Sequence, residues 1–173
     1  MKLRSSDPKY IKEVDKWYSY LLPRLRPYLY SNGGPIIMIQ LENEFGDFGC
    51  DFQYLTHLRD SFIKLLGKDV VLFTTDNDRD SALECGKIDG VFATVDFGID
   101  SNPDESFAIQ RRHQQFGPNV NSEFYSGWLD YWGRPHSMTD TESVCRSIDR
   151  ILYLNASMNM WALSEVNNNQ GVS

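Results

Sequence analysis

Residues 32–46, NGGPIIMIQLENEFG, decide the fold. A turn cluster from Asn32 to Pro35 precedes an apolar run over 36–41 that is broken only by Gln40. Continuous apolar residues after a turn signal predict a strand buried on both faces, as in parallel sheets. The strand leads into the acidic and amide residues of 42–44, so candidate functional side chains are expected directly after it.

The same alternation continues along the chain. Asp7 and Pro8 predict a helix start, and Pro23 and Pro27 are expected to kink or end that helix before the turn cluster. Gly67 is placed to end the second helix. Apolar patterning predicts the remaining strands at 70–75, 90–95, 120–124 and 158–163, and helices over 52–66, 81–84, 103–114 and 139–155.

Strands separated by helices predict an α/β protein with parallel strands, either an open doubly wound sheet or a (β/α) barrel. Neither G-x-G-x-x-G nor G-x-x-x-x-G-K-[ST] occurs, and this favours the barrel. A complete barrel usually takes ~250 residues, and five strands cannot close one. We therefore expect an incomplete (β/α)8 TIM barrel, with chain ends that look cut.

Composition excludes several other classes. A net charge of −7 and a pI near 4.9 argue against nucleic acid as the main partner. No apolar run approaches the ~18–20 residues of a membrane span, and the first residues lack the apolar core of a signal peptide. The three His are too scattered for zinc, and no cofactor motif occurs, so neither a metal nor a cofactor is expected. Asp76, Asp78 and Asp80 lack the Gly and Glu of a calcium loop and are expected to form a solvated connection.

Two carboxylates sit where predicted strands end, Glu44 after the first and Glu123 at the end of the fourth. The carboxyl ends of barrel strands open onto one face, so the two acids can meet there. A facing pair of carboxyl groups is what glycoside hydrolysis requires, although sequence spacing does not distinguish retention from inversion. Aromatic residues follow the second acid and suit a sugar pocket, although such residues are more often core: Phe124, Tyr125, Trp128, Tyr131 and Trp132.

Residues 32–46 and NSEFYSGWLDYWG at 121–133 resemble the two active-site motifs of family 35 glycoside hydrolases, the lysosomal and secreted acid β-galactosidases. LFTTD at 72–76 and TVDFG at 94–98 resemble the same family in the same order, so the resemblance runs from about residue 3 to 161. It implies that the first strand is barrel strand four and the last is strand eight. Residues 1–173 would then be one partial catalytic domain that lacks strands one to three.

The resemblance also implies roles for individual residues. Glu44 matches the acid/base, Asn43 the contact to the sugar hydroxyl beside the anomeric centre, Glu123 the nucleophile, and Tyr125 the tyrosine beside it. Trp161 stands where many members have a sugar-contacting Tyr. The implied substrate is a β-galactoside, cleaved with retention and without a cofactor.

Three cysteines taken alone more often mean free buried thiols. The resemblance instead implies a disulfide between Cys50 and Cys85, with Cys145 unmatched. A disulfide indicates an oxidising compartment, and the family implies a lysosomal or secreted location.

The chain also departs from the family. The loops that recognise the galactose 4- and 6-hydroxyls fall outside it, and residues 164–167 (SEVN) replace a Gly-Gly-Thr-Asn-Phe motif. With open strand edges, the isolated chain is expected to fold poorly and to have little activity. Two alternatives stay open: a non-catalytic, truncated sugar-binding product, and a retaining glycosidase of the same superfamily with another sugar specificity.

Overall fold

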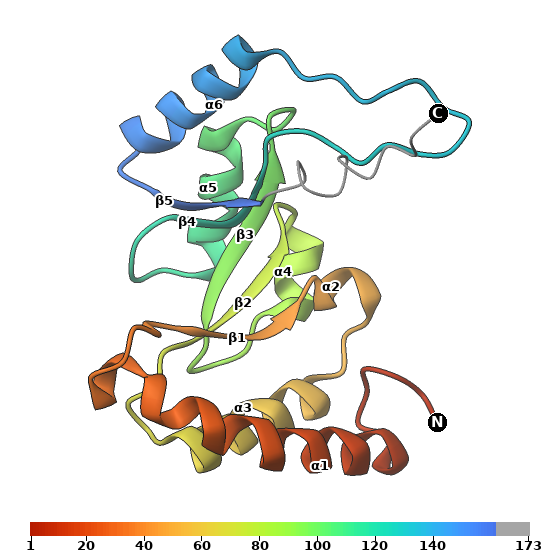
Figure 1. Ribbon diagram of the computed structural model, residues 1–173, viewed down its shortest axis with the longest axis vertical. Coiled ribbons are helices and arrows are strands. Elements are labelled where there is room, and N and C mark those ends of the chain that lie inside the picture. Colours follow the sequence, from red (N-terminus) through yellow and green to blue (C-terminus); the bar gives the residue numbers. More distant parts are fainter. Residues whose placement is uncertain (162–173) are drawn as a thin grey trace, which may run out of the picture. The chain divides into compact units, whose positions relative to one another are not determined.

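The computed structural model describes residues 1–161, and the chain forms two compact units. The first unit holds Met1–Asp76 and Asp80–Ala93, and the second holds Asn77–Arg79 and the chain from Thr94 onward. Helices and strands alternate through both units, as the labels in Figure 1 show. The structure is α/β, with five parallel strands alternating with helices, and this part of the fold prediction is confirmed.

In the first unit, β1 pairs in parallel with β2, with Ile39 opposite Leu72 and Asn43 opposite Thr75. The register shifts between Gln40 and Glu42. The last residue of β2 belongs to the second unit. The elements of the first unit, in chain order, are α1 (Pro8–Leu25), η1 (Arg26–Tyr28), η2 (Tyr30–Asn32), β1 (Ile39–Asn43), α2 (Phe45–Phe48), α3 (Phe52–Leu66), β2 (Leu72–Asn77) and α4 (Asp80–Gly86).

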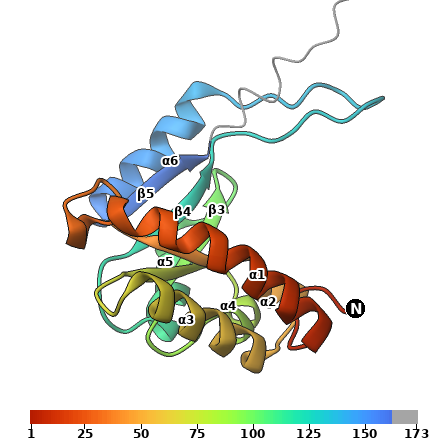
Figure 2. The ribbon, with the colours of Figure 1, turned by 60° about the horizontal axis from the view of Figure 1, so that its bottom comes forward.

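Helices α1 and α3 pack side by side in both ribbon views (Figures 1 and 2). Each helix begins at an aspartate whose side chain accepts a backbone N–H: Asp7 accepts from Lys9, and Asp51 accepts from Tyr54. The ring of Tyr18 meets the ring of Phe62 edge to face at 4.8 Å. The α3 helix has the predicted bounds because its cap, its apolar stripe and its terminal Gly67 all agree.

The prediction for the first strand is wrong in detail. The first strand begins at Ile39 rather than at residue 36, because the backbone of Ile36 bonds to Tyr28 and Tyr30 at the preceding turn. Ile37 is 68% exposed, so this segment is not buried on both faces. Helix α1 continues through Pro23 and ends at Leu25, before Pro27, so the expectation that it would end before the turn cluster is confirmed.

The second unit contains β3 (Phe92–Gly98, whose first two residues belong to the first unit), α5 (Pro103–His113), β4 (Val120–Tyr125), α6 (Thr141–Tyr153) and β5 (Ser157–Trp161). β4 pairs in parallel with β3 on one side and with β5 on the other. Figure 2 shows α6 running beside β5. The rings of Phe97 and Phe107 meet at 5.3 Å, and Phe124 and Ile151 are fully buried.

The last two residues of the predicted strand 158–163, and the departure from the family at 164–167, lie outside the described residues. Within residues 1–161, no helix is both long enough and apolar enough to cross a bilayer.

Candidate active site

Glu44 directly follows β1 and precedes the short helix α2 (Phe45–Phe48). Its backbone has φ 48° and ψ 37°, in the left-handed region that side-chain-bearing residues rarely occupy. Its N–H donates to the carbonyl of Thr75 at 2.6 Å, which ties the residue to the end of β2. The side chain is half-buried and does not cap α2. The carboxyl group therefore makes no capping hydrogen bond to the helix that follows it.

Asn43, the last residue of β1, is held by its neighbours. Gln40 Nε2 donates to Asn43 Oδ1 at 2.7 Å, and the Asn43 N–H donates to Glu42 Oε2 at 2.8 Å. Arg4 Nη2 donates to the Asn43 carbonyl at 2.5 Å. Both the side-chain amide and the backbone of Asn43 are therefore fixed in orientation.

Glu42 is the centre of this support. Arg4 binds it with two nitrogens, at 2.9 and 3.1 Å, and the Tyr54 hydroxyl donates to it at 2.9 Å. Burial acts to lower the pKa of Arg4, but the hydrogen bond and charge of Glu42 leave it raised. Burial, followed by the charge of Glu42, raises the pKa of Tyr54. Sequence reasoning missed this cluster, because Arg4 lies 38 residues before its partner.

Glu123 lies in β4 and is buried, with 9% of its surface exposed. Its backbone N–H donates to Asn121 Oδ1 at 3.1 Å. Asp96 of β3 is its partner in strand register and is also buried. The Tyr125 hydroxyl joins the two acids, at 2.6 Å from Asp96 Oδ2 and 3.2 Å from Glu123 Oε2. Asp96 is a further residue of the candidate site that sequence reasoning did not identify, although it lies in the family-like segment TVDFG.

Trp161, the last residue of β5, is paired in register with Tyr125. Within the second unit, the structure thus brings Glu123, Tyr125 and Trp161 to the same end of neighbouring strands. The aromatic residues after Glu123 divide into different roles: Phe124 is fully buried core, Trp128 packs edge-on against Tyr125 at 5.6 Å, and Trp132 is 99% exposed.

Cys50 and Cys85 form a disulfide with a Cα separation of 4.7 Å, and Cys145 is an exposed free thiol. The bridge ties the segment after α2 to the end of α4. It therefore lies in the same unit as Glu44 and fixes the chain six residues beyond it.

The expectation for Asp76 is wrong. Its side chain is 0% exposed rather than solvated, because Gly46 and Gly86 allow α2 and α4 to close around it. The sequence around Asp76 gives no signal that this residue is buried, since an aspartate is usually exposed.

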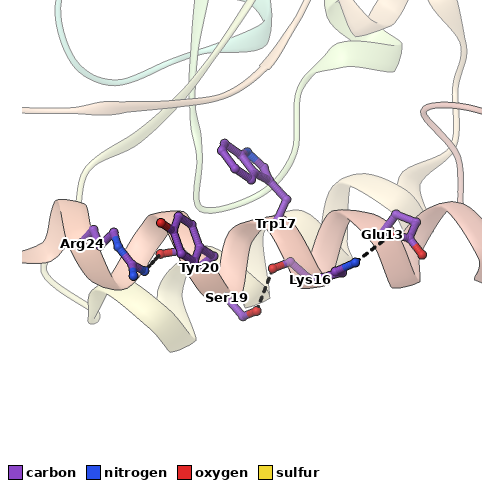
Figure 3. A pocket seen from close by; sticks show the side chains of 6 residues that line it. All are labelled: Glu13, Lys16, Trp17, Ser19, Tyr20 and Arg24. Carbon is purple, nitrogen blue, oxygen red and sulfur yellow. Dashed lines mark hydrogen bonds and ion pairs between the residues drawn. The ribbon is translucent and has the colours of Figure 1, made fainter.

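A hollow of about 720 Å³ lies elsewhere in the first unit, along α1 (Figure 3). It contains none of the predicted site residues. Among residues 1–161, no three or more His, Cys, Asp or Glu side chains are grouped so as to hold a metal ion. The hollow is lined by Glu13, Lys16, Trp17, Ser19, Tyr20 and Arg24.

Comparison with known proteins identifies the sequence relatives. The profile of glycosyl hydrolases family 35 matches residues 1–163. The chain is 54% identical to a β-galactosidase of Macaca fascicularis and 52% identical to that of Homo sapiens, each over 92% of this chain. It is 46% identical to a β-galactosidase-1-like protein of Mus musculus. The chain spans 24% of the length of each of these relatives.

A solved structure also resembles the chain. A β-glucanase from Saccharophagus degradans aligns with 90% of this chain and 53% of its own length, with a TM-score of 0.51 and 15% identity. At that identity the likeness concerns the fold alone.

Proposed function

Because this chain belongs to glycosyl hydrolase family 35, we propose that it is the part of a retaining β-galactosidase that carries both catalytic carboxyl groups. The observation that carries the proposal is the placement of two acids at the carboxyl ends of parallel strands, Glu44 directly after β1 and Glu123 near the end of β4. In this proposal the five strands are strands four to eight of an eight-stranded barrel, whose carboxyl ends share one face.

Glu123 is the proposed nucleophile. It attacks the anomeric carbon while the glycosidic bond breaks, and a covalent galactosyl-enzyme forms. The Tyr125 hydroxyl lies beside the attacking carboxylate, 3.2 Å from Glu123 Oε2. Trp161, in register with Tyr125, supplies an apolar ring surface for the sugar.

Glu44 is the proposed acid/base. It donates its proton to the leaving oxygen, and then takes a proton from the water that hydrolyses the intermediate. A separation of about 5 Å between the two carboxyl groups is expected for this double displacement. Asn43, whose Oδ1 already accepts from Gln40, is oriented to offer its NH2 group to the hydroxyl beside the anomeric centre.

A lysosomal or secreted location is part of the proposal. The Cys50–Cys85 disulfide supports it, because such bonds persist in oxidising compartments. The substrate class is a terminal β-galactoside, which follows from the names of the relatives.

The test places this chain in a complete protein by exchanging it for the corresponding segment of the macaque β-galactosidase. We expect the chimera to hydrolyse an aryl β-galactoside and to lose activity in Glu123→Ala and Glu44→Ala variants, by about 10²–10⁴-fold for the acid/base. Azide distinguishes the two roles, because it enters the space that each truncation leaves. Glu123→Ala should then give the α-galactosyl azide, and Glu44→Ala the β-galactosyl azide. An active chimera that keeps its activity in both variants would reject the assignment.

A second candidate is a sugar-binding product without turnover. Titrating the 173-residue chain with galactose, alongside the aryl galactoside assay, separates the two. Saturable binding without hydrolysis by the chain or by the chimera would support this alternative. Aryl glucosides and mannosides in the same assay test for a different sugar specificity.

A further inference from the structure

Asp76 of β2 is a buried acid that the proposed reaction does not use. One carboxyl oxygen, Oδ1, accepts the N–H of Gly46 at 3.0 Å. The other, Oδ2, is buried and has no hydrogen-bond partner among residues 1–161. A buried carboxylate normally has its oxygens satisfied, so this arrangement fits the neutral carboxylic acid better than the anion.

The space around this carboxyl group is closed by two glycines. A Cβ at Gly86 of α4 would lie 1.9 Å from Asp76 Oδ1, and a Cβ at Gly46 of α2 would lie 1.8 Å from the carbonyl oxygen of Ala82. The Cys50–Cys85 disulfide joins the two segments that approach each other here. Water is therefore kept away from the carboxyl group by the close packing of α2 and α4.

Two acidic side chains, Asp47 and Glu42, act on Asp76 with charges of its own sign. Burial above all, together with the charges of Asp47 in α2 and Glu42 in β1, raises its pKa to about 7. The Gly46 amide and the Thr74 hydroxyl act in the opposite direction and do not offset the burial. Near neutral pH, Asp76 is thus at the point where it gains or loses its proton.

The end of β2 holds the segment that carries Glu44 at two points. Thr75 accepts the N–H of Glu44 at 2.6 Å, and Asp76 accepts the N–H of Gly46, in the first turn of α2. Glu44 itself does not cap this turn and has a left-handed backbone. Asp76 therefore supplies, from another strand, the acceptor that the start of α2 lacks.

We propose that Asp76 is a positioning residue for Glu44 and that it acts in its protonated form, so that loss of its proton loosens the segment from Glu44 to Phe48. A neutral carboxyl group can stay in the closed site and hold Gly46. An ionised one brings a third acidic charge beside Asp47 and Glu42, and it is relieved only when α2 moves away and water enters. The consequence for catalysis rests on the proposed role of Glu44. The link between the protonation of Asp76 and the mobility of residues 44–48 does not.

Two measurements on the 173-residue chain test the coupling. The first is the carboxyl ¹³C shift of Asp76 across the pH range, which is expected to titrate near pH 7. The second is the protection of the Gly46 amide from hydrogen exchange, corrected for the intrinsic exchange rate. From pH 5 to pH 8 we expect protection to fall on the order of tenfold or more in the native chain.

Asp76→Asn is the matched variant, because it keeps the shape and an acceptor oxygen but cannot ionise. Its Gly46 protection should not change between pH 5 and pH 8, whereas the exposed control Asp69→Asn should behave as the native chain does. The proposal is overturned if Asp76 titrates near pH 4, if Gly46 is unprotected at pH 5, or if the native chain and Asp76→Asn lose protection alike.

These readouts need no turnover. Failure of the Glu44 assignment would show in the azide experiment with the chimera and would leave both measurements unchanged. Failure of the Asp76 coupling would show in the carboxyl titration and the amide exchange, and would leave the two catalytic assignments intact.

Discussion

Tyr125 donates its hydroxyl hydrogen to Oδ2 of Asp96 across 2.6 Å, from one strand to its neighbour. A phenol has one hydrogen, and the contact to Glu123 Oε2 is longer, at 3.2 Å. The hydrogen is therefore committed to Asp96 when both acids are ionised. The proposed nucleophile has a polar neighbour that is directed away from it by a second carboxylate.

Tyr125→Phe tests this relationship through stability. Removing the hydroxyl deprives the buried Asp96 of a short hydrogen bond, so the free energy of unfolding should fall by about 1–3 kcal/mol. Denaturant unfolding at constant pH measures it. Tyr131→Phe is the control, since its hydroxyl accepts from Trp128 at 3.0 Å on an exposed surface and its loss should change stability by less than about 0.5 kcal/mol. Equal effects for the two variants would contradict the prediction.

Arg4→Ala should destabilise the first unit by about 2–3 kcal/mol, because it leaves the half-buried Glu42 without its cation and Asn43 without a donor to its carbonyl. The exposed pair Arg146–Glu142 gives the comparison. Arg146→Ala should cost about 0.5 kcal/mol or less, as surface ion pairs do. Chemical denaturation of both variants decides, and a loss at Arg4 no larger than that at Arg146 would count against a structural role for the cluster.

The pH dependence of stability follows from Asp76. Its folded pKa of about 7 lies above its ordinary value of 3.8, so between these pH values the folded protein keeps a proton that the unfolded chain has lost. Raising the pH through this window therefore favours unfolding, and the stabilising contribution is complete below about pH 4 and lost above about pH 7. Three pKa units correspond to about 4 kcal/mol.

Other groups titrate in the same range, so the measurement is a difference. The free energy of unfolding of Asp76→Asn, subtracted from that of the native chain, should decline from pH 4 to pH 7 and then level off. A difference that is flat, or that rises with pH, would refute the raised pKa.

Breaking the Cys50–Cys85 bridge should remove about 3–4 kcal/mol, the chain-entropy contribution of a loop with a sequence separation of 35. Thermal unfolding of the Cys50→Ser, Cys85→Ser double variant measures the loss. Cys145→Ser should have little effect, since that thiol is exposed and unbridged. Reducing agent should lower the melting temperature of the native chain but not that of the double variant.

Local signals predicted the elements well where they agreed with one another. Residues 52–66 have a capping aspartate before them, an apolar stripe along them and a glycine after them, and the α3 helix has these bounds. The strand predicted at 36–41 begins three residues late, at Ile39, because Ile36 bonds to the preceding turn, a contact between segments that residue type does not reveal. The short helix α2 was not predicted, since four residues are too few to show a period.

In the candidate site, too, residues with local sequence signals were predicted and residues that depend on distant partners were not. Glu44 and Glu123 were identified from strand ends and family-like motifs, and both signals are local in sequence. Arg4, Asp96 and the burial of Asp76 depend on partners that lie far away in the chain. Pairings of this kind are set by the assembled fold and leave no spacing to recognise.

Because Glu44 has a left-handed backbone, the replacements that would stabilise the protein at this position are not those that keep its carboxyl group. A glutamate held there stores conformational strain of about 1–2 kcal/mol, which glycine would relieve and asparagine would reduce. A library of variants at residue 44 that is screened only for heat resistance should therefore enrich those two replacements and discard the carboxyl group that the proposed hydrolysis needs. Directed evolution of this protein has to select for turnover and melting temperature together.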